Sequence, residues 1–281
     1  MTQLILITGA STGIGRATAL ELAAKGHTVL AGIRNQDAAD ELISASGGAL
    51  EPVFLDIADT GSLDTFCSTY ASRFEENGLQ GLVNNAGLFG AGPLEYTSME
   101  KWRKMFDVNV FGHVDLTQRL LPYVRKARGR IVFTSSASTR LALPLGGSYC
   151  GAKFAIEGIA DSLRRELHSF GVKVSIVEPG AIETPMLNAT KETYERLADE
   201  LQGDGADTYR NVASGIAKAV AKFASQSTPP ERIAKAILHA LFSSNPKVRY
   251  FVGTDAKILS TLAAITTDKV MDAILRKMFN Q

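Results

Sequence analysis

The chain alternates short apolar runs with longer segments of helical periodicity, and this alternation limits its fold more than any other feature. Strands that are buried on both faces have such continuous apolar character, whereas half-exposed strands alternate apolar and polar residues. Expected strands lie at 4–7, 28–31, 53–55, 81–83, 131–133 and 172–177, and expected helices at 16–25, 38–43, 61–74, 99–124 and 149–170. The pattern predicts an α/β fold with a doubly wound parallel sheet and helices on both faces.

The pattern changes after the sixth expected strand. Residues 181–227 are mostly polar helix-formers, residues 230–241 predict a helix that opens on Pro230, and residues 248–252 predict a late strand. Polar stretches interrupt this tail too often for it to hold a core of its own. We therefore expect a single domain over 1–281: a core of about 3–185 with the strand 248–252, a substrate lid over 187–228, and a helical tail over 255–281.

Composition excludes several classes of protein. Lys and Arg total 30 against 29 Asp and Glu, without a concentrated basic stripe, so we expect no nucleic-acid partner. The two cysteines form no CxxC pair and the four histidines lack ligand spacing, which argues against a disulfide framework or a metal site. No run approaches the roughly 18 apolar residues of a membrane span, and no signal peptide is indicated, so we expect a cytoplasmic protein.

A glycine-rich loop joins the first expected strand to the first expected helix. It reads Thr8-Gly-Ala-Ser-Thr-Gly-Ile-Gly15, with the glycines spaced GxxxGxG. Glycines there allow a tight turn and let backbone N–H groups approach a pyrophosphate at the positive end of a helix. An ordinary strand-to-helix turn is the alternative. The position and spacing favour a dinucleotide-binding loop.

The loop and the motifs that follow it resemble the short-chain dehydrogenase/reductase family over residues 3 to about 185. The matching residues, in family order, are Thr8–Gly15, Asn84-Asn85-Ala86-Gly87, Asn109, Ser136, Tyr149 and Lys153 as Tyr-xxx-Lys, and Pro179-Gly180. The resemblance implies a single-domain Rossmann-like fold with a C-terminal helical extension. It also implies an NAD(P)-dependent oxidoreductase that acts on CH–OH groups.

The residue types explain the expected chemistry. Tyr149 and Lys153 are four residues apart, so they share one face of a helix. A tyrosine has a pKa of about 10, and a nearby ammonium favours the phenolate and lowers that pKa. Tyr149 can then exchange a proton with a substrate oxygen, which Ser136 would hold. We prefer Ser136 to Ser135 and Ser138, because its offset of 13 from Tyr149 matches the family.

The resemblance also assigns further roles. It gives Lys153 a grip on the nicotinamide ribose and places Asn109 in a water relay behind that lysine. The expected cofactor-binding residues are Gly9, Ser11, Thr12, Gly13, Ile14, Gly15, Arg34, Asp56, Ile57, Asn85, Ala86, Gly87, Tyr149, Lys153, Pro179, Gly180, Ile182 and Thr184.

The end of the second expected strand bears on the choice of cofactor. NAD enzymes place an acid there for the ribose hydroxyls, whereas NADP enzymes place an arginine near the 2′-phosphate. Ile33 stands at the acidic position and Arg34 follows it, which favours NADP(H) over NAD(H). The alternative is a surface arginine beside Asp37, with Asp37 capping the next helix. The basic loop residue of many NADP enzymes is absent, since Thr12 stands there.

The expected substrate is a bulky apolar ketone or aldehyde, or the corresponding secondary alcohol. Leu143 lies in the apolar segment 141–145 and should line the substrate site with Ser136 and Tyr149. The expected helices 99–124 and 149–170 are apolar over a wide arc, which predicts a homodimer or homotetramer. Alternatives are a catalytically inactive binding or regulatory member, an NAD-dependent alcohol dehydrogenase, and an epimerase or dehydratase, whose loop glycines are usually spaced GxxGxxG.

Overall fold

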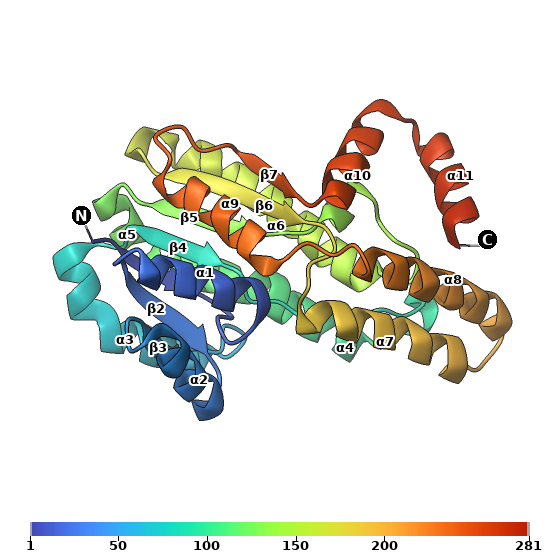
Figure 1. The fold of residues 1–281 in the computed structure, drawn as a ribbon, viewed down its shortest axis with the longest axis horizontal. Helices are drawn as coiled ribbons and strands as arrows, with labels where there is room; N and C mark the ends of the chain where they lie inside the picture. Colours follow the sequence, from blue (N-terminus) through green and yellow to red (C-terminus); the bar gives the residue numbers. More distant parts are fainter. Residues whose placement is uncertain (1, 280–281) are drawn as a thin grey trace.

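A computed structural model describes residues 2–279, which fold around one seven-stranded parallel sheet (Figure 1). The strands are β1 Leu4–Ile7, β2 Thr28–Ile33, β3 Glu51–Phe54, β4 Gly81–Asn84, β5 Arg130–Thr134, β6 Lys173–Pro179 and β7 Arg249–Val252. Their order is β3-β2-β1-β4-β5-β6-β7, and every neighbouring pair is parallel. The predicted fold class is confirmed. The winding reverses between β1 and β4, which opens a crevice at their carboxyl ends.

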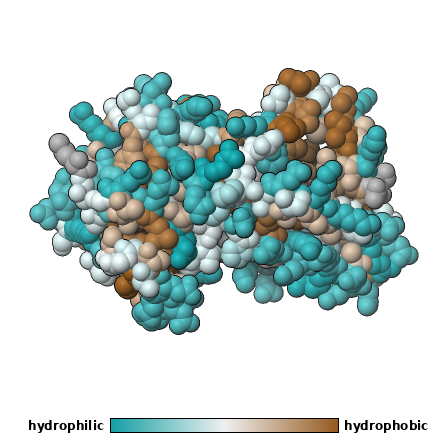
Figure 2. Space-filling view, in the orientation of Figure 1, coloured by the Kyte–Doolittle hydropathy of each residue, from teal (hydrophilic) through white to brown (hydrophobic). Residues whose placement is uncertain are grey.

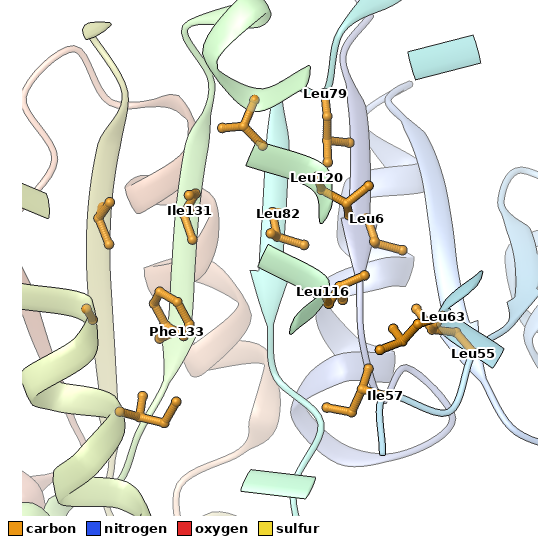
Figure 3. Packing of buried hydrophobic residues seen from close by; sticks show 14 of the residues in the cluster. Leu6, Leu55, Ile57, Leu63, Leu79, Leu82, Leu116, Leu120, Ile131 and Phe133 are labelled. Carbon is orange, nitrogen blue, oxygen red and sulfur yellow. The ribbon is translucent and has the colours of Figure 1, made fainter. Parts of the chain in front are cut away.

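Helices cover both faces of the sheet, because each strand presents apolar side chains to both sides. One face carries α1 Gly13–Ala24, α2 Gln36–Ser46 and α9 Pro230–Phe242; the other carries α3 Thr60–Asn77, α5 Gly112–Ala127 and α6 Gly147–Glu166 (Figure 1). Successive residues of β1 alternate between the two cores. Leu6 packs with Leu116 and Leu120 on the α5 side (Figure 3), while Ile5 and Ile7 belong to the cluster on the α1 and α9 side.

The α-helix expected to run without a break over 99–124 is interrupted in the structure. Helix α4 Met99–Phe106 passes into a π-helical stretch, Asp107–Phe111, before α5 begins at Gly112. A π-helical turn inserts extra backbone without ending the helix and is frequent at functional sites. Here it carries Asn109, whose side chain is fully buried. The helix expected over 149–170 ends at Glu166 and is followed by a short 3₁₀ turn, His168–Phe170.

The C-terminal part forms helices in the segments where helix-forming residues and a helical tail are expected. Helices α7 Pro185–Glu200, α8 Ala206–Ala224, α10 Thr254–Ile265 and α11 Asp268–Phe279 gather beyond the carboxyl edge of the sheet (Figure 1). Their facing sides enclose a third apolar cluster that includes Tyr194, Ile216 and Phe279. Leu141 also belongs to this cluster, and Phe89 and Leu143 pack against it, so the tail shares its apolar contacts with the part of the chain that holds the sheet.

The surface over α10 and α11 is the most apolar part of the face shown in Figure 2. Exposed apolar side chains there include Ile258, Ile265 and Val270.

Among residues 2–279, no helix combines the length and apolar character that a membrane crossing requires.

Candidate active site

The glycine loop approaches its neighbours so closely that side chains are excluded. Gly9 and Gly13 have positive φ angles of 65° and 54°. A Cβ on Gly9 would lie 2.8 Å from Ala86 Cα, and one on Gly15 would lie 2.1 Å from the Gly9 carbonyl oxygen. The loop therefore forms a bare backbone cradle at the start of α1, which is the surface that a dinucleotide pyrophosphate requires.

The segment after β4 is fastened to this loop by side-chain hydrogen bonds. Thr8 Oγ1 accepts bonds from the backbone N–H groups of Asn85 at 2.9 Å and Ala86 at 3.0 Å. The Asn85 Nδ2 group donates to the Thr8 carbonyl at 3.0 Å. The Asn85 side chain thus holds the loop in place from behind, a role that the sequence did not reveal.

A buried histidine supports the same segment from the helix side. His113 Nε2 lies 2.8 Å from the Ala86 carbonyl oxygen, to which it must donate. Burial, aided by the nearby Lys153 ammonium, lowers the pKa of His113 to about 3. This histidine is therefore neutral at physiological pH and serves as a hydrogen-bond donor. Sequence reasoning missed it, because a lone histidine in an apolar helix carries no signal.

Asn109 lies close to the expected catalytic residues but is held by the backbone. Its Oδ1 accepts from Leu88 N at 2.8 Å, and its Nδ2 donates to Leu88 O at 2.9 Å. Gly87 sits between Asn109 and Lys153: a Cβ there would be 3.2 Å from Asn109 Oδ1 and 3.6 Å from Lys153 Nζ. Asn109 thereby fixes the segment after β4 beside the lysine.

The structure brings Ser136, Tyr149 and Lys153 together at the carboxyl end of β5. Ser136 lies just after β5, its Oγ accepts from Ser138 N at 3.2 Å, and it is near enough to the Tyr149 phenol to influence the pKa of that group. Lys153 Nζ donates to the Thr134 carbonyl at 2.9 Å and lies 5.9 Å from the centre of the Tyr149 ring. The serine hydroxyl, the phenol and the ammonium therefore border one space.

Burial dominates the protonation of this group. It raises the pKa of Tyr149 to about 12, against which the Ser136 hydrogen bond acts in the lowering direction. It lowers the pKa of Lys153 to about 8, with Glu157 opposing the fall. The expectation of a lowered tyrosine pKa is therefore wrong, because desolvation of the phenol dominates. Tyr149 keeps its proton at neutral pH and can donate it to a substrate oxygen.

One large cleft runs from the glycine loop to the apolar segment after Ser136. All the expected cofactor-binding residues except Gly15 line it, as do Ser136 and Leu143; Asn109 lies behind its wall. Arg34 lines the adenosine end and is exposed, whereas the Ile33 side chain is buried in the core. Asn35, and not Asp37, caps α2, since its Oδ1 accepts from Ala38 N at 2.9 Å.

The far end of the cleft contains residues that sequence reasoning missed. Asp255 Oδ2 accepts from Ala181 N at 2.6 Å, and a Cβ on Gly180 would lie 2.0 Å from Asp255 Oδ1. This carboxylate therefore fixes the turn after β6. Its place just after the late strand was the available signal, because carboxyl ends of parallel strands share one edge. Side chains from the helices beyond also line the cleft: Met186, Leu187, Thr190, Tyr194, Ile216, Ala219, Val220, Phe223, Leu259, Met278 and Phe279.

Comparison with known proteins identifies the family of the chain. A sequence profile described as short chain dehydrogenase matches residues 3–195. Retinol dehydrogenase 5 of Mus musculus is 37% identical over 96% of this chain and 87% of its own length. Short-chain dehydrogenase/reductase family 9C member 7 of Bos taurus is 35% identical over 97% of this chain and 88% of its own length.

A solved structure of the same family agrees over the whole chain. A short-chain dehydrogenase from Streptomyces avermitilis superposes with a TM-score of 0.78 at 29% identity, covering 100% of this chain and 96% of that one. The chain belongs to the short-chain dehydrogenase/reductase family, as the sequence motifs indicated. It is an NAD(P)-dependent enzyme that acts on CH–OH groups.

The buried lysine should make the protein less stable at neutral pH. The folded-state pKa of Lys153 is about 8, below the 10.5 of an ordinary lysine. Between these values the unfolded chain binds more protons, so the free energy of unfolding rises with pH. Lys153→Met should raise that free energy by about 1–3 kcal/mol at pH 7, and the difference should fade between pH 8 and 10.5.

Denaturant unfolding at a series of pH values measures this effect. Lys104→Met, which replaces an exposed lysine on α4, provides the control and should show no such pH-dependent gain. A Lys153→Met variant that is less stable than the wild type at pH 7 would show that the hydrogen bond to Thr134 outweighs the burial of the charge.

Proposed function

We propose that this enzyme transfers a hydride between NADP(H) and a bulky apolar alcohol or its carbonyl product, with Ser136, Tyr149 and Lys153 as the catalytic residues. The observation that carries the proposal is that a hydroxyl, a phenol and the ammonium of a buried lysine border one cleft beside an apolar wall. Each side chain has a role at one substrate oxygen. The cradle of the glycine loop fits the cofactor, and its shape requires glycine, since a Cβ at Gly9 or Gly15 would clash with the backbone of Ala86 or of Gly9 itself.

A nicotinamide held in this cleft would supply or accept the hydride at the reacting carbon. Tyr149 donates its proton to the carbonyl oxygen during reduction and takes it back during oxidation of the alcohol. The Ser136 hydroxyl holds the same oxygen. The Lys153 ammonium stabilises the phenolate that the proton transfer leaves, and it would grip the nicotinamide ribose. Asn109 holds Leu88 and, as the family resemblance implies, takes part in a water relay behind the lysine.

Replacing the phenol tests the assigned proton transfer. Tyr149→Phe keeps the ring but removes the transferable proton, so kcat should fall by roughly 10²–10⁴-fold. Binding of NADPH, followed by fluorescence titration, should stay nearly unchanged. Tyr123→Phe, at a tyrosine remote from the cleft, is the matched control. Near-wild-type turnover by Tyr149→Phe would refute the mechanism.

Arg34 supports the choice of NADP(H). Its guanidinium is exposed at the adenosine end of the cleft, where it can bind a 2′-phosphate through two parallel hydrogen bonds. The buried Ile33 offers no acceptor for the ribose hydroxyls that NAD presents instead. NAD(H) is the alternative cofactor.

Removing this guanidinium should therefore separate the two cofactors. Arg34→Ala should weaken NADPH binding by about ten- to a hundredfold, which corresponds to the loss of a charge-assisted hydrogen bond. Binding of NADH should change little. The NADPH affinity of Arg34→Lys should lie between those of the wild type and of Arg34→Ala. Titration of both cofactors with each variant measures this. Equal losses for both, or tighter NADH binding by the wild type, would reject the assignment.

The proposed substrate class rests on the wall of the cleft and on the relatives. Leu141 and Leu143 line one side near Tyr149, and Ala219, Val220 and Phe223 of α8 line the other. Such a surface favours long or bulky apolar molecules. Among the relatives, retinol dehydrogenases carry the name of a large apolar alcohol. We propose that α7 and α8 act as a lid that closes over a substrate of this kind and excludes water.

A chain-length series tests the lid. Each buried methylene contributes about 0.8 kcal/mol, so kcat/KM should rise nearly fourfold per added methylene along a series of aldehydes. Ala219→Trp should shorten the pocket and flatten the series at the long end. Lys218→Trp, the exposed neighbour on the same helix, should leave it unchanged. A flat series for the wild type would contradict the lid proposal.

We propose that the enzyme is a homodimer or homotetramer. Apolar side chains remain exposed on one face formed by α4, the π-helical stretch and α6, including Met99, Phe111 and Phe154. A second copy could cover this face. Light scattering at micromolar concentration should give at least twice the chain mass, and Phe111→Asp with Phe154→Asp should reduce it. A wild-type monomer would exclude the proposal.

A further inference from the structure

Beneath the catalytic serine lies a network of charged side chains that the proposed mechanism does not use; two of its carboxylates are buried, and its other members are about a quarter exposed. We call it the ion network; its members are Arg140, Glu157, Asp161, Glu178 and Arg249. These residues come from four different elements, three of which border the cleft. Arg140 is in the 3₁₀ turn that begins just after Ser136, Glu157 and Asp161 are on α6, Glu178 is on β6, and Arg249 is on β7.

Glu178 is the centre of the ion network. Its side chain is fully buried, and Arg140 binds both of its oxygens, with Nε at 2.8 Å from Oε2 and Nη2 at 2.6 Å from Oε1. Arg249 Nε lies 3.4 Å from Oε1 and also donates to Glu157 Oε2 at 3.0 Å. Two parallel bonds from a guanidinium fix direction as well as distance. The carboxylate therefore holds the 3₁₀ turn against β6 in one orientation.

The ion network reaches the catalytic residues through short paths. Thr139 Oγ1 lies 2.8 Å from the Ser136 carbonyl oxygen and 3.3 Å from Glu178 Oε2. Glu178 directly precedes Pro179 and Gly180, which line the nicotinamide end of the cleft. Glu157 stands one helical turn after Lys153 on α6. The network thus joins the serine turn, the lysine helix and the nicotinamide turn at one point.

Stability alone does not account for such an arrangement. Burying charges costs solvation energy, and well-packed apolar residues of similar volume are often as stabilising as a buried ion pair, or more so. An apolar contact, however, lacks the directional constraint of the paired guanidinium and carboxylate. A displacement of about 1 Å at a catalytic group can reduce the rate about a hundredfold. What the ion network adds to simple apolar packing is therefore a fixed position for the groups that it holds.

We propose that Arg140 and Glu178 are positioning residues that set Ser136 and the Pro179-Gly180 turn relative to Tyr149 and Lys153. The inference rests on the proposed catalytic function of those residues. It predicts that the pair can be exchanged for apolar side chains with little effect on folding but with a large effect on the chemical step.

The test uses a double replacement, Arg140→Met with Glu178→Leu, which leaves no buried charge without a partner because Arg249 retains Glu157 and Asp161. We expect Tm near that of the wild type, a kcat that is roughly ten- to a hundredfold lower with a long-chain aldehyde and NADPH, and a small change in KM. Amide hydrogen exchange over residues 136–140 should be faster. The matched control exchanges the more exposed pair Arg73 and Glu51 for Met and Leu and should change neither kcat nor exchange.

A folded double variant with wild-type kcat and wild-type exchange over 136–140 would overturn the proposal. If the double variant does not fold, Arg140→Lys decides, because a single ammonium cannot form both parallel bonds. It should lower kcat several-fold while Tm stays close to the wild type; an unchanged kcat and unchanged exchange would again overturn the proposal. The proposed catalytic function is tested separately, because undiminished turnover by Tyr149→Phe would refute it. Amide hydrogen exchange over residues 136–140 reports on the positioning of the serine turn and does not depend on turnover.

Discussion

The close approach of two backbone segments at the switch point between β1 and β4 is the constraint on which the site depends. Gly9 lies so near Ala86 that a side chain at position 9 would push the two segments apart. Thr8 and Asn85 then fasten the two loops by hydrogen bonds between side-chain and backbone groups. The same contact therefore fixes both the cradle for the pyrophosphate and the segment beside Lys153.

Around this junction three buried polar side chains are paired with backbone groups. Lys153 donates to a strand carbonyl, and His113 donates to a loop carbonyl. Asn109 both donates to and accepts from the backbone of Leu88. Burial then moves the pKa of the lysine down and that of Tyr149 up. The phenol is accordingly neutral and the amine is easily deprotonated. The chemistry that we propose depends on this dry environment as much as on the identity of the three side chains.

Much of this could be predicted along the chain, because local spacing carries it. Continuous apolar runs indicated a parallel sheet buried on both faces, and the observed sheet has that form. The glycine spacing and the Tyr-xxx-Lys pair indicated the family, which comparison with known proteins confirms. Errors occurred where local preference was overruled by packing. The helix that was expected to run unbroken through Asn109 takes a π-helical turn there.

The sequence by itself determined the fold class and the residues that meet at the strand ends, since parallel strands bring the residues that follow them to one edge. Only the tertiary structure decided what surrounds them. Asp255 reaches the turn after β6 from a helix 74 residues further along the chain. The ion network joins Arg140, Glu178 and Arg249 from three separate elements. Such contacts have no signature in local spacing, because they depend on how distant elements pack and on which charges that packing removes from water.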